Sequence, residues 1–241
     1  MSYSTNKKTF NIDSSQRSDG SVSNFEITLR VPPNEFTHVS VVQAEIAKSW
    51  NMVDGTSDFV MSFTDAGGTD AAITISAGNY NAVQLGTELQ TQLNASGTLS
   101  LTYTVAYDSD TNRYTISAGG AFTITYSDKT IYKYFGFSAT QASAANAVTS
   151  DVDSNLQRYD CIAIRSNMCK NFDTDELAFI YPNSYAGASI ISYVPTNPTF
   201  TACTAKFDKN QFRFSVTDAN TNKVIDLDGV PIRLTVCAWK E

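Results

Sequence analysis

Apolar and polar residues alternate in short runs along the first part of the chain, and turn residues separate these runs. Phe25, Ile27 and Leu29 occupy every second position before the Pro32-Pro33 turn, so their side chains fall on one face of an extended segment. The pattern recurs in a longer apolar-rich run, Val39 to Ala47, and again at Phe59, Met61 and Phe63. These runs predict three β-strands within residues 24–64.

Residues 65–138 have a different pattern, which includes one amphipathic helix from Ala82 to Asn94. Its apolar residues recur at helical spacing, at Ala82, Leu85, Leu89 and Leu93. Asn81 is the expected N-cap and forms a capping-box pattern with Gln84. Gly97 is the residue expected to close the helix in a left-handed conformation.

Strand and turn patterns surround this helix. They predict a short strand at Ile73–Ile75, a hairpin of Leu101–Tyr107 and Tyr114–Ile116 across the turn 108–112, a strand at Phe122–Tyr126, and a short helix at 128–135 ended by Gly136. Residues 65–138 are therefore expected to form a small α+β unit inserted between strands of the main domain.

Short strands resume after a small and polar stretch, residues 139–158, which we interpret as a linker loop. The later candidates are Cys161–Ile164, Leu177–Tyr181, Ser189–Val194, Thr201–Phe207, Phe212–Val216 and Ile232–Ala238. With the three early strands they total eight or nine. This number of regularly spaced strands predicts a mainly β protein with an antiparallel β-sandwich, and eight is the count of a single jelly roll.

The chain accordingly divides into five segments. We expect an N-terminal arm at 1–23, jelly-roll strands at 24–64, the inserted unit at 65–138, the linker loop at 139–158, and the remaining strands at 159–241. The arm is polar, yet Phe10-Asn11-Ile12 alternates like a strand. It is either a frayed terminus or an arm that orders against a neighbouring subunit.

Composition supports a large folded domain and limits its partners. The chain has 241 residues, of which 42% are apolar and 17% charged, and a net charge of -7, so it can bury a sizeable core. Its Lys and Arg residues are scattered rather than gathered into the basic patch expected of a nucleic-acid binder. No direct role in nucleic-acid binding is therefore expected.

No apolar run approaches the roughly 18 residues of a membrane-spanning helix, and the N-terminal sequence MSYSTNKKTF lacks an apolar signal region. The four cysteines, Cys161, Cys169, Cys203 and Cys237, have no CxxC spacing. We interpret them as reduced thiols, and a pairing of Cys161 with Cys169 in an extracellular particle stays open.

Catalytic motifs are absent from the sequence. His38 is the one histidine, and no Ser-His-Asp arrangement, GxSxG, HExxH or P-loop pattern occurs. Acidic clusters at Asp151-Val-Asp153 and Asp173-Thr-Asp175-Glu176 are interpreted as solvated loops. Asp108-x-Asp110-x-Asn112 and Asp226-x-Asp228-Gly229 resemble the start of Ca²⁺ loops but are better explained as turns. We expect no enzyme activity, no metal and no cofactor.

Several tyrosines fall on the strands of the inserted unit: Tyr103, Tyr107, Tyr114 and Tyr126. Exposed together, they could stack on sugars or dock a partner. Otherwise they form the core of a small unit that has only one substantial helix to cover it, which is the interpretation we favour.

The order of these elements resembles the order found in a family of viral proteins. The polar N-terminal arm carries an IDSSQR element, and the step Ala47-Lys48-Ser49-Trp50 ends the long strand. GNYNAVQL begins the helix, Phe135-Gly136-Phe137 follows the hairpin, and KVIDLDGVPIRLTVCAWKE closes the chain. Together they resemble the jelly-roll minor capsid or penton proteins of icosahedral double-stranded DNA viruses, such as virophages, Polinton-like viruses and giant-virus relatives.

This resemblance implies a structural virion protein, a penton that closes the five-fold vertices of the capsid. It implies a homo-oligomer, expected to be a pentamer, made in the infected cell and located in the virion. The implied partners are a double jelly-roll major capsid protein and other minor capsid proteins. The residues we expect at partner contacts are Phe10, Ile12, Arg17, Tyr103, Tyr107 and Tyr114.

Three alternatives stay open at this point. The chain could be a minor or cementing capsid protein away from the vertex. It could be a receptor- or glycan-binding spike or fibre head, with the inserted tyrosines carrying the binding. It could also be a hydrolase on a β-sandwich that uses Asp173, Asp175 or Glu176.

Overall fold

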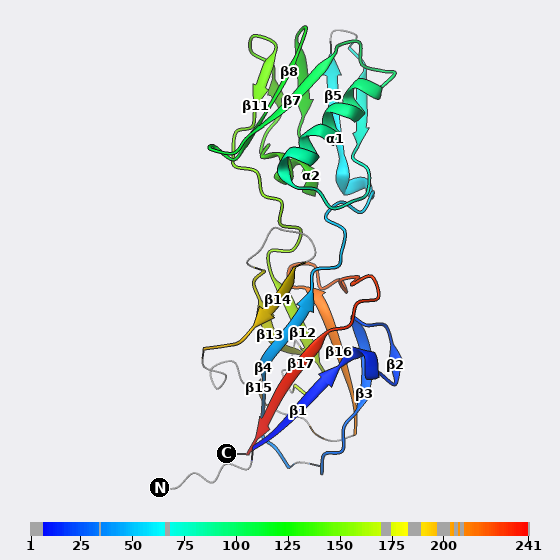
Figure 1. Cartoon of the computed structure of the whole chain (residues 1–241), viewed down its shortest axis with the longest axis vertical. Helices are drawn as coiled ribbons and strands as arrows, with labels where there is room; N and C mark the ends of the chain where they lie inside the picture. Colours follow the sequence, from blue (N-terminus) through cyan, green and yellow to red (C-terminus); the bar gives the residue numbers. More distant parts are fainter. Residues whose placement is uncertain are drawn as a thin grey trace. The chain divides into compact units, whose positions relative to one another are not determined.

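The computed structural model describes residues 7–33, 35–65, 68–169, 175–182, 189–196, 203–204, 207 and 210–240. The chain divides into two compact units, coloured along the sequence in Figure 1. Met1–Trp50 and Tyr159–Glu241 form the first, which we call the sandwich unit, and Asn51–Arg158 form the second, the inserted unit.

Two antiparallel sheets make up the sandwich unit (Figure 1). The first has the order β1-β17-β4-β14, with β15 also paired to β4, and the second has the order β13-β12-β16-β3-β2. Their bounds are β1 Lys7–Asp13, β17 Arg233–Trp239, β4 His38–Ala47, β14 Ile190–Tyr193, β15 Cys203–Thr204, β13 Glu176–Ile180, β12 Ile162–Ser166, β16 Gln211–Asp218, β3 Asn24–Thr28 and β2 Asp19–Gly20. A 3-10 helix, η1 Ser14–Gln16, joins β1 to β2.

The strand pairing is that of a long hairpin rolled up on itself. Among its eight principal strands the first pairs with the last, β1 with β17, and the second with the seventh, β3 with β16. The third pairs with the sixth, β4 with β14, and the fourth with the fifth, β12 with β13. This nested pairing is the topology of a jelly roll, and it confirms the expected antiparallel β-sandwich.

Alternating side chains from both sheets form the core of the sandwich unit. Phe25 of β3 stacks on Phe214 of β16, with ring centroids 5.7 Å apart. Phe10 of β1 meets Phe36 edge to face at 6.4 Å. Aromatic pairs in these geometries stabilise a core beyond the area that they bury.

The segment expected to be an N-terminal arm therefore needs correction over residues 7–13. These residues form β1, which pairs with β17 in a continuous register from Lys7↔Trp239 to Asp13↔Arg233. Phe10 and Ile12 alternate because they face the core of their own chain.

The inserted unit has two smaller sheets, a principal helix and its own core. The sheets have the orders β10-β9-β5-β6 and β11-β8-β7. The bounds are η2 Ser57–Phe59, β5 Val60–Asp65, β6 Asp70–Thr74, α1 Ala82–Ala95, β7 Tyr103–Asp108, β8 Arg113–Ala118, β9 Phe122–Thr125, α2 Thr130–Phe135, β10 Gln141–Ala142 and β11 Ala147–Thr149. In the described part of the chain, neither helix is long and apolar enough to cross a membrane.

The boundaries of the inserted unit are wider than the sequence indicated. β5, expected in the sandwich, pairs with β6 and β9 of the inserted unit. The expected linker loop 139–158 contains β10 and β11, which pair with β9 and β8. The alternation of β5 places Met61 and Phe63 on a buried face but does not specify which core they enter.

The principal helix begins as predicted and ends differently. The Asn81 side chain accepts from the Gln84 N–H, and the Gln84 side chain accepts from the Asn81 N–H, which completes the capping box. Gly97 was expected to end the helix in a left-handed conformation, and this was wrong: Ser96 is the C-cap, with its N–H on the Leu93 carbonyl. Gly136 does end α2 in the left-handed conformation, with φ 74°.

Candidate assembly surfaces

Two of the residues that could support catalysis, His38 and Glu176, are engaged in structural contacts. His38 stacks on Trp239 with ring centroids 5.6 Å apart, and its Nδ1 lies 3.0 Å from the Thr37 hydroxyl. Glu176 pairs with Arg165 at 2.6 Å, whereas Asp173 lies outside the described residues. Within those residues, no group of three or more His, Cys, Asp or Glu side chains could hold a metal ion.

The two sequences that resembled Ca²⁺ loops are turns. Asp108 accepts from the Asp110 N–H at 2.9 Å and from the Thr111 hydroxyl at 2.8 Å. These hydrogen bonds, the Asp110 N–H first, hold the pKa of Asp108 below its ordinary value. Asp226 likewise accepts from the Asp228 N–H at 2.9 Å. Both carboxylates therefore close their own turns.

The tyrosines of the inserted unit belong mainly to its core. Tyr103 and Tyr114 are fully buried. Tyr107 is half-buried, its hydroxyl donates to Asn112 Oδ1 at 2.6 Å, and its ring lies 5.0 Å from that of Tyr114. These side chains do not form an exposed stacking platform, so the core interpretation describes this cluster.

Of the three expected contact residues near the N-terminus, one is on the surface. Phe10 and Ile12 are buried in the sandwich core, so they are not available to a neighbouring chain. Arg17 is exposed, and its guanidinium donates to the carbonyls of Gly20 and Ser14 at 2.9 and 3.0 Å. The structure thus holds Arg17 in a fixed position beside β2.

Cys161 and Cys237 have free thiols, and the Cys169 Sγ lies 3.5 Å from the Glu176 carbonyl oxygen. Cys161 and Cys169 are buried, and they are not joined to one another. Burial raises the pKa of the Cys161 thiol, which lowers its reactivity. This arrangement agrees with the interpretation of reduced thiols for Cys161 and Cys237.

A first candidate surface is the edge where β13 and β14 end the two sheets of the sandwich. Four large apolar side chains on or next to these strands are exposed, and we call them the edge strip: Phe179, Tyr181, Ile190 and Val194. Tyr181 and Ile190 are 73% and 70% exposed. Apolar side chains on sheet edges favour association with another chain unless something covers them.

A second candidate surface lies beside β2, where η1 and the turn into β3 meet the loop between β16 and β17. It is a shallow depression of about 550 Å³, which we call the flank hollow. Its lining includes Arg17, Ser21, Val22, Val224, Asp226 and Pro231. Val224 is exposed, and so is Val230, which lies between Gly229 and Pro231 in the sequence. The flank hollow therefore combines an apolar wall with one cation and one anion.

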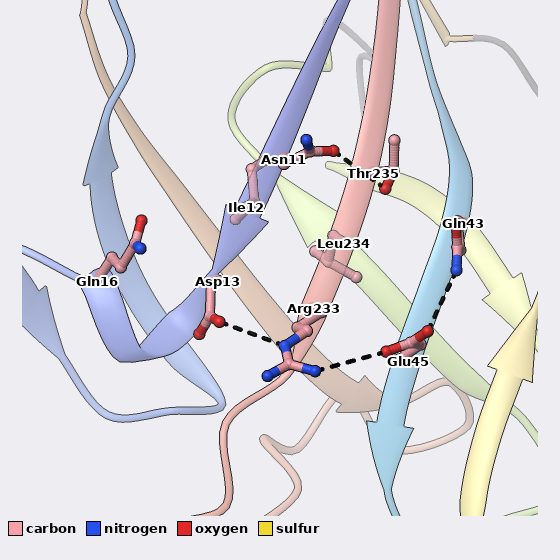
Figure 2. Close-up of a pocket in the computed structure, with 9 residues that line it drawn as sticks. All are labelled: Asn11, Ile12, Asp13, Gln16, Gln43, Glu45, Arg233, Leu234 and Thr235. Atoms are coloured by element: carbon pink, nitrogen blue, oxygen red, sulfur yellow. Dashed lines mark hydrogen bonds and ion pairs between the residues drawn. The ribbon is translucent and has the colours of Figure 1, made fainter.

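A third surface, shown in Figure 2, is a polar depression of about 340 Å³ on the outer face of the first sheet. Arg233 of β17 lies between Asp13 of β1, at 3.4 Å, and Glu45 of β4, at 4.0 Å. The three residues are directly opposite one another in the strand register. Hydrogen bonds to Ser15, followed by contact with Arg233, keep the pKa of Asp13 below its ordinary value. This row ties β1 to the sheet, because the one guanidinium pairs with a carboxylate on each neighbouring strand.

Sequence reasoning missed the edge strip and the flank hollow. Ile190 and Ile191 are adjacent isoleucines, yet one is exposed and the other buried. Only the register of β14 against β4, Ile190↔Ala47 and Ile191↔Ile46, decides which faces the core. No local signal distinguishes the two.

The two sheets and their nested pairing define the class of protein: a jelly-roll β-sandwich with an α+β unit inserted between its third and fourth principal strands. No model of a known protein family matches the chain, and no curated protein sequence matches it.

Among solved structures, the chain is similar to the crystal structure of the penton protein of mavirus. The TM-score is 0.62 and the sequence identity 12%, and the match covers 96% of this chain and 99% of that chain. The likeness includes the inserted unit as well as the sandwich, because it spans nearly the full length of both. It confirms the fold that the family resemblance implied.

Proposed function

We propose that this chain is a penton, the capsomer at the five-fold vertices of an icosahedral double-stranded DNA virus. The observation that carries the proposal is the near full-length structural match to the mavirus penton protein. A jelly roll alone hosts many functions, but here the position and extent of the inserted unit are matched as well.

The proposed mechanism is assembly rather than turnover. A ring of identical subunits closes when each copy presents two different, complementary flanks and the rotation per copy is one fifth of a turn. The partners in this proposal are further copies of the chain, a double jelly-roll major capsid protein and other minor capsid proteins. The chain would be made in the infected cell and reside in the virion capsid.

One feature of the chain weighs against a direct role in nucleic-acid binding, and another supports the penton proposal over a glycan-binding head. The net charge of -7 is unfavourable for wrapping or packaging nucleic acid. The burial of Tyr103 and Tyr114 removes the tyrosine platform on which a glycan-binding head would depend. A cementing protein away from the vertex could have the same fold, so only the position of the chain in the virus particle distinguishes it from a penton.

The first test is the mass of the purified chain in solution, measured by light scattering coupled to size exclusion, with negative-stain images of the peak. We expect a ring of five copies of the 26.3 kDa chain. A stable trimer would contradict the penton proposal and favour a spike or fibre head. If the chain forms a ring of five, imaging of virus particles would show whether it lies at the five-fold vertices or at a cementing position elsewhere in the capsid.

A further inference from the structure

The flank hollow has a mostly polar lining, and three separate segments of the sandwich unit form it. Arg17 is the C-cap of η1, Ser21 and Ser23 belong to the turn between β2 and β3, and Val224 and Asp226 belong to the loop between β16 and β17. A depression of about 550 Å³ is within the size range of ligand sites.

The Arg17 guanidinium is held in place before any ligand arrives. Its Nε donates to the Gly20 carbonyl at 2.9 Å, and its Nη1 donates to the Ser14 carbonyl at 3.0 Å. A guanidinium has five N–H groups, so three remain. Within the described part of the chain, no other group accepts a hydrogen bond from Arg17. The side chain is therefore both positioned and able to bind a further acceptor.

The backbone that holds Arg17 is itself tied down. Gly20 has φ 88°, and a Cβ there would lie 2.2 Å from the Asn24 carbonyl oxygen, so the turn can close only with glycine. Ser14 bonds twice to Ile232, through its N–H at 3.0 Å and its hydroxyl at 2.9 Å. These contacts join η1 to the segment that leads into β17, so the walls of the hollow are fixed relative to one another.

The other polar groups of the hollow are two hydroxyls and a carboxylate. Ser21 Oγ accepts from the Asn24 N–H at 3.1 Å and lies 3.4 Å from Ser23 Oγ. One of these two hydroxyl protons can lie between the oxygens, and the other is left to donate. The Asp226 carboxylate accepts from the Asp228 N–H at 2.9 Å through Oδ1, and among the described residues nothing donates to Oδ2.

This arrangement selects the chemistry of a ligand. The guanidinium and the hydroxyls suit a carboxylate. Asp226 accepts from a neighbouring N–H and repels a second negative charge, which disfavours a phosphate dianion. No lining residue is aromatic, so the hollow offers no surface on which a nucleic-acid base could stack. A peptide that contains an acidic residue supplies the carboxylate and the N–H together.

We propose that the flank hollow binds an acidic residue in a peptide segment of a partner protein. Arg17 binds the carboxylate of that residue, Asp226 accepts from a backbone N–H beside it, and Val224 contacts its methylene groups. The carboxylate can belong to an acidic side chain or to the end of a chain, since both have the same chemistry. The inference goes beyond the penton proposal and does not depend on it.

The test is a titration of the full chain with short peptides, followed by ligand-observed NMR. The probe is acetyl-Ala-Glu-Ala-amide, and acetyl-Ala-Gln-Ala-amide is its neutral counterpart. Acetyl-Ala-Ala-Ala with a free carboxyl end represents a chain terminus, and inorganic phosphate is the competitor. Arg17→Gln removes the guanidinium, whereas Val224→Trp fills the hollow and keeps Arg17. Arg30→Gln is the matched control, because Arg30 is an exposed arginine of the same unit outside the hollow.

We expect the glutamate peptide to bind the unaltered chain and Arg30→Gln equally. Binding should be weaker by a factor of about ten or more in Arg17→Gln and in Val224→Trp, and for the glutamine peptide, because each change removes a charged hydrogen bond or the space for it. Tighter binding of the peptide with a free carboxyl end would identify a chain terminus as the source. Circular dichroism verifies folding, and Val224→Trp carries the test if Arg17→Gln does not fold.

Four results would overturn the proposal. The first is equal binding of the glutamate and glutamine peptides, and the second is binding that persists in a folded Arg17→Gln variant or in Val224→Trp. The third is no binding of either acidic peptide at concentrations of about 10 mM, which corresponds to a negligible affinity. The fourth is displacement by phosphate at the same concentration as the peptide, which would show a general anion site. The mass of the chain in solution tests the penton proposal separately.

Discussion

Two buried tyrosines of the inserted unit differ in one hydrogen bond. The Tyr114 hydroxyl donates to the Ala82 carbonyl at 2.7 Å. The Tyr103 hydroxyl is buried and has no hydrogen-bond partner in the described structure. A buried hydroxyl that forms a hydrogen bond stabilises a protein modestly. A buried hydroxyl without a partner destabilises it, because the hydrogen bonds to water that it loses on folding are not replaced.

The two positions therefore predict opposite effects of the same substitution. Tyr114→Phe should lower the free energy of unfolding by about 1 kcal/mol, because it removes the hydrogen bond from the Tyr114 hydroxyl to the Ala82 carbonyl. Tyr103→Phe should leave it unchanged or raise it, since the ring and its packing are kept. Urea unfolding followed by fluorescence measures both, and the reverse ranking of the two variants would contradict the explanation.

The Tyr103 side chain also affects the stability of the chain at alkaline pH. Burial, together with the charge of Asp65, raises the pKa of Tyr103 to about 12. The pKa in the unfolded chain is about 10, so the unfolded state releases this proton first. The contribution is complete below pH 10 and is lost as the pH rises to about 12.

We therefore expect the free energy of unfolding to fall as the pH rises above 10, and to fall less steeply in Tyr103→Phe. Urea titrations between about pH 9 and 11.5 measure both slopes. Burial also raises the pKa of Tyr114, so some slope should remain in the variant. Identical slopes in the two proteins would rule out Tyr103 as a source.

At the scale of elements, α1 does more than cover the core of the inserted unit. The Asn94 side chain accepts from the Tyr103 N–H at 2.8 Å and donates to the Tyr103 carbonyl at 2.9 Å. Gln90 accepts from the Val105 N–H at 2.9 Å. Since β7 ends its sheet, these amides occupy the position of a further strand and protect the edge.

Asn94→Ala should expose this edge. Two backbone groups of Tyr103 lose their partners, so we expect the free energy of unfolding to fall by about 1–3 kcal/mol and the Tyr103 amide to exchange faster with deuterium. Thr91→Ala on the same helix is the control, because Thr91 bonds only to the Thr87 carbonyl of α1. Equal exchange in both variants would contradict the edge-protection role.

The end of α2 offers a second comparison, between two glycines. Gly136 has φ 74°, and a Cβ there would lie 2.2 Å from the Val152 carbonyl oxygen. Gly136→Ala should therefore destabilise the chain by about 1–3 kcal/mol. Gly97→Ala should be neutral or slightly stabilising, because φ is not positive and no atom lies within 4 Å. Thermal unfolding of the two variants checks this ranking.

At the scale of the whole molecule, the chain is two units with separate cores rather than one. The first and last residues of the inserted unit are joined by Arg158, which donates to the Asn51 carbonyl and pairs with Asp54. Its guanidinium also lies 5.7 Å from the centroid of the Phe59 ring. These contacts close the unit on itself.

The inserted unit should accordingly fold when excised. We expect a fragment of residues 51–158 to show the helical signal of α1 in circular dichroism and to lose this signal in one cooperative unfolding transition. Arg158→Ala in the fragment should lower its free energy of unfolding by about 1.5–3 kcal/mol, since hydrogen bonds to charged groups are of this size. A fragment without cooperative unfolding would show that the sandwich is needed for its stability.

Local chemistry in the sequence was enough to determine most of the individual elements, although it missed β2, β10 and β11. Alternation placed most of the strands, the Asn81–Gln84 pair marked the start of α1, and Gly136 marked the end of α2. Each depends on residues within a few positions of one another, so a short window contains all the information. The jelly-roll class also followed, because it depends on the number and spacing of these strands.

Only the tertiary structure decided how the elements combine. Alternation identifies the buried face of a strand but not its partner, so β5 was assigned to the wrong unit and β1 was not recognised as a strand of the sandwich. β1 pairs with β17, more than 200 residues away. The exposure of Ile190 beside the buried Ile191 follows from the register of β14, which long-range hydrogen bonds fix. The candidate assembly surfaces are products of this long-range pairing. The sequence alone determined β13 and β14, which carry the edge strip, but not β2, beside which the flank hollow lies.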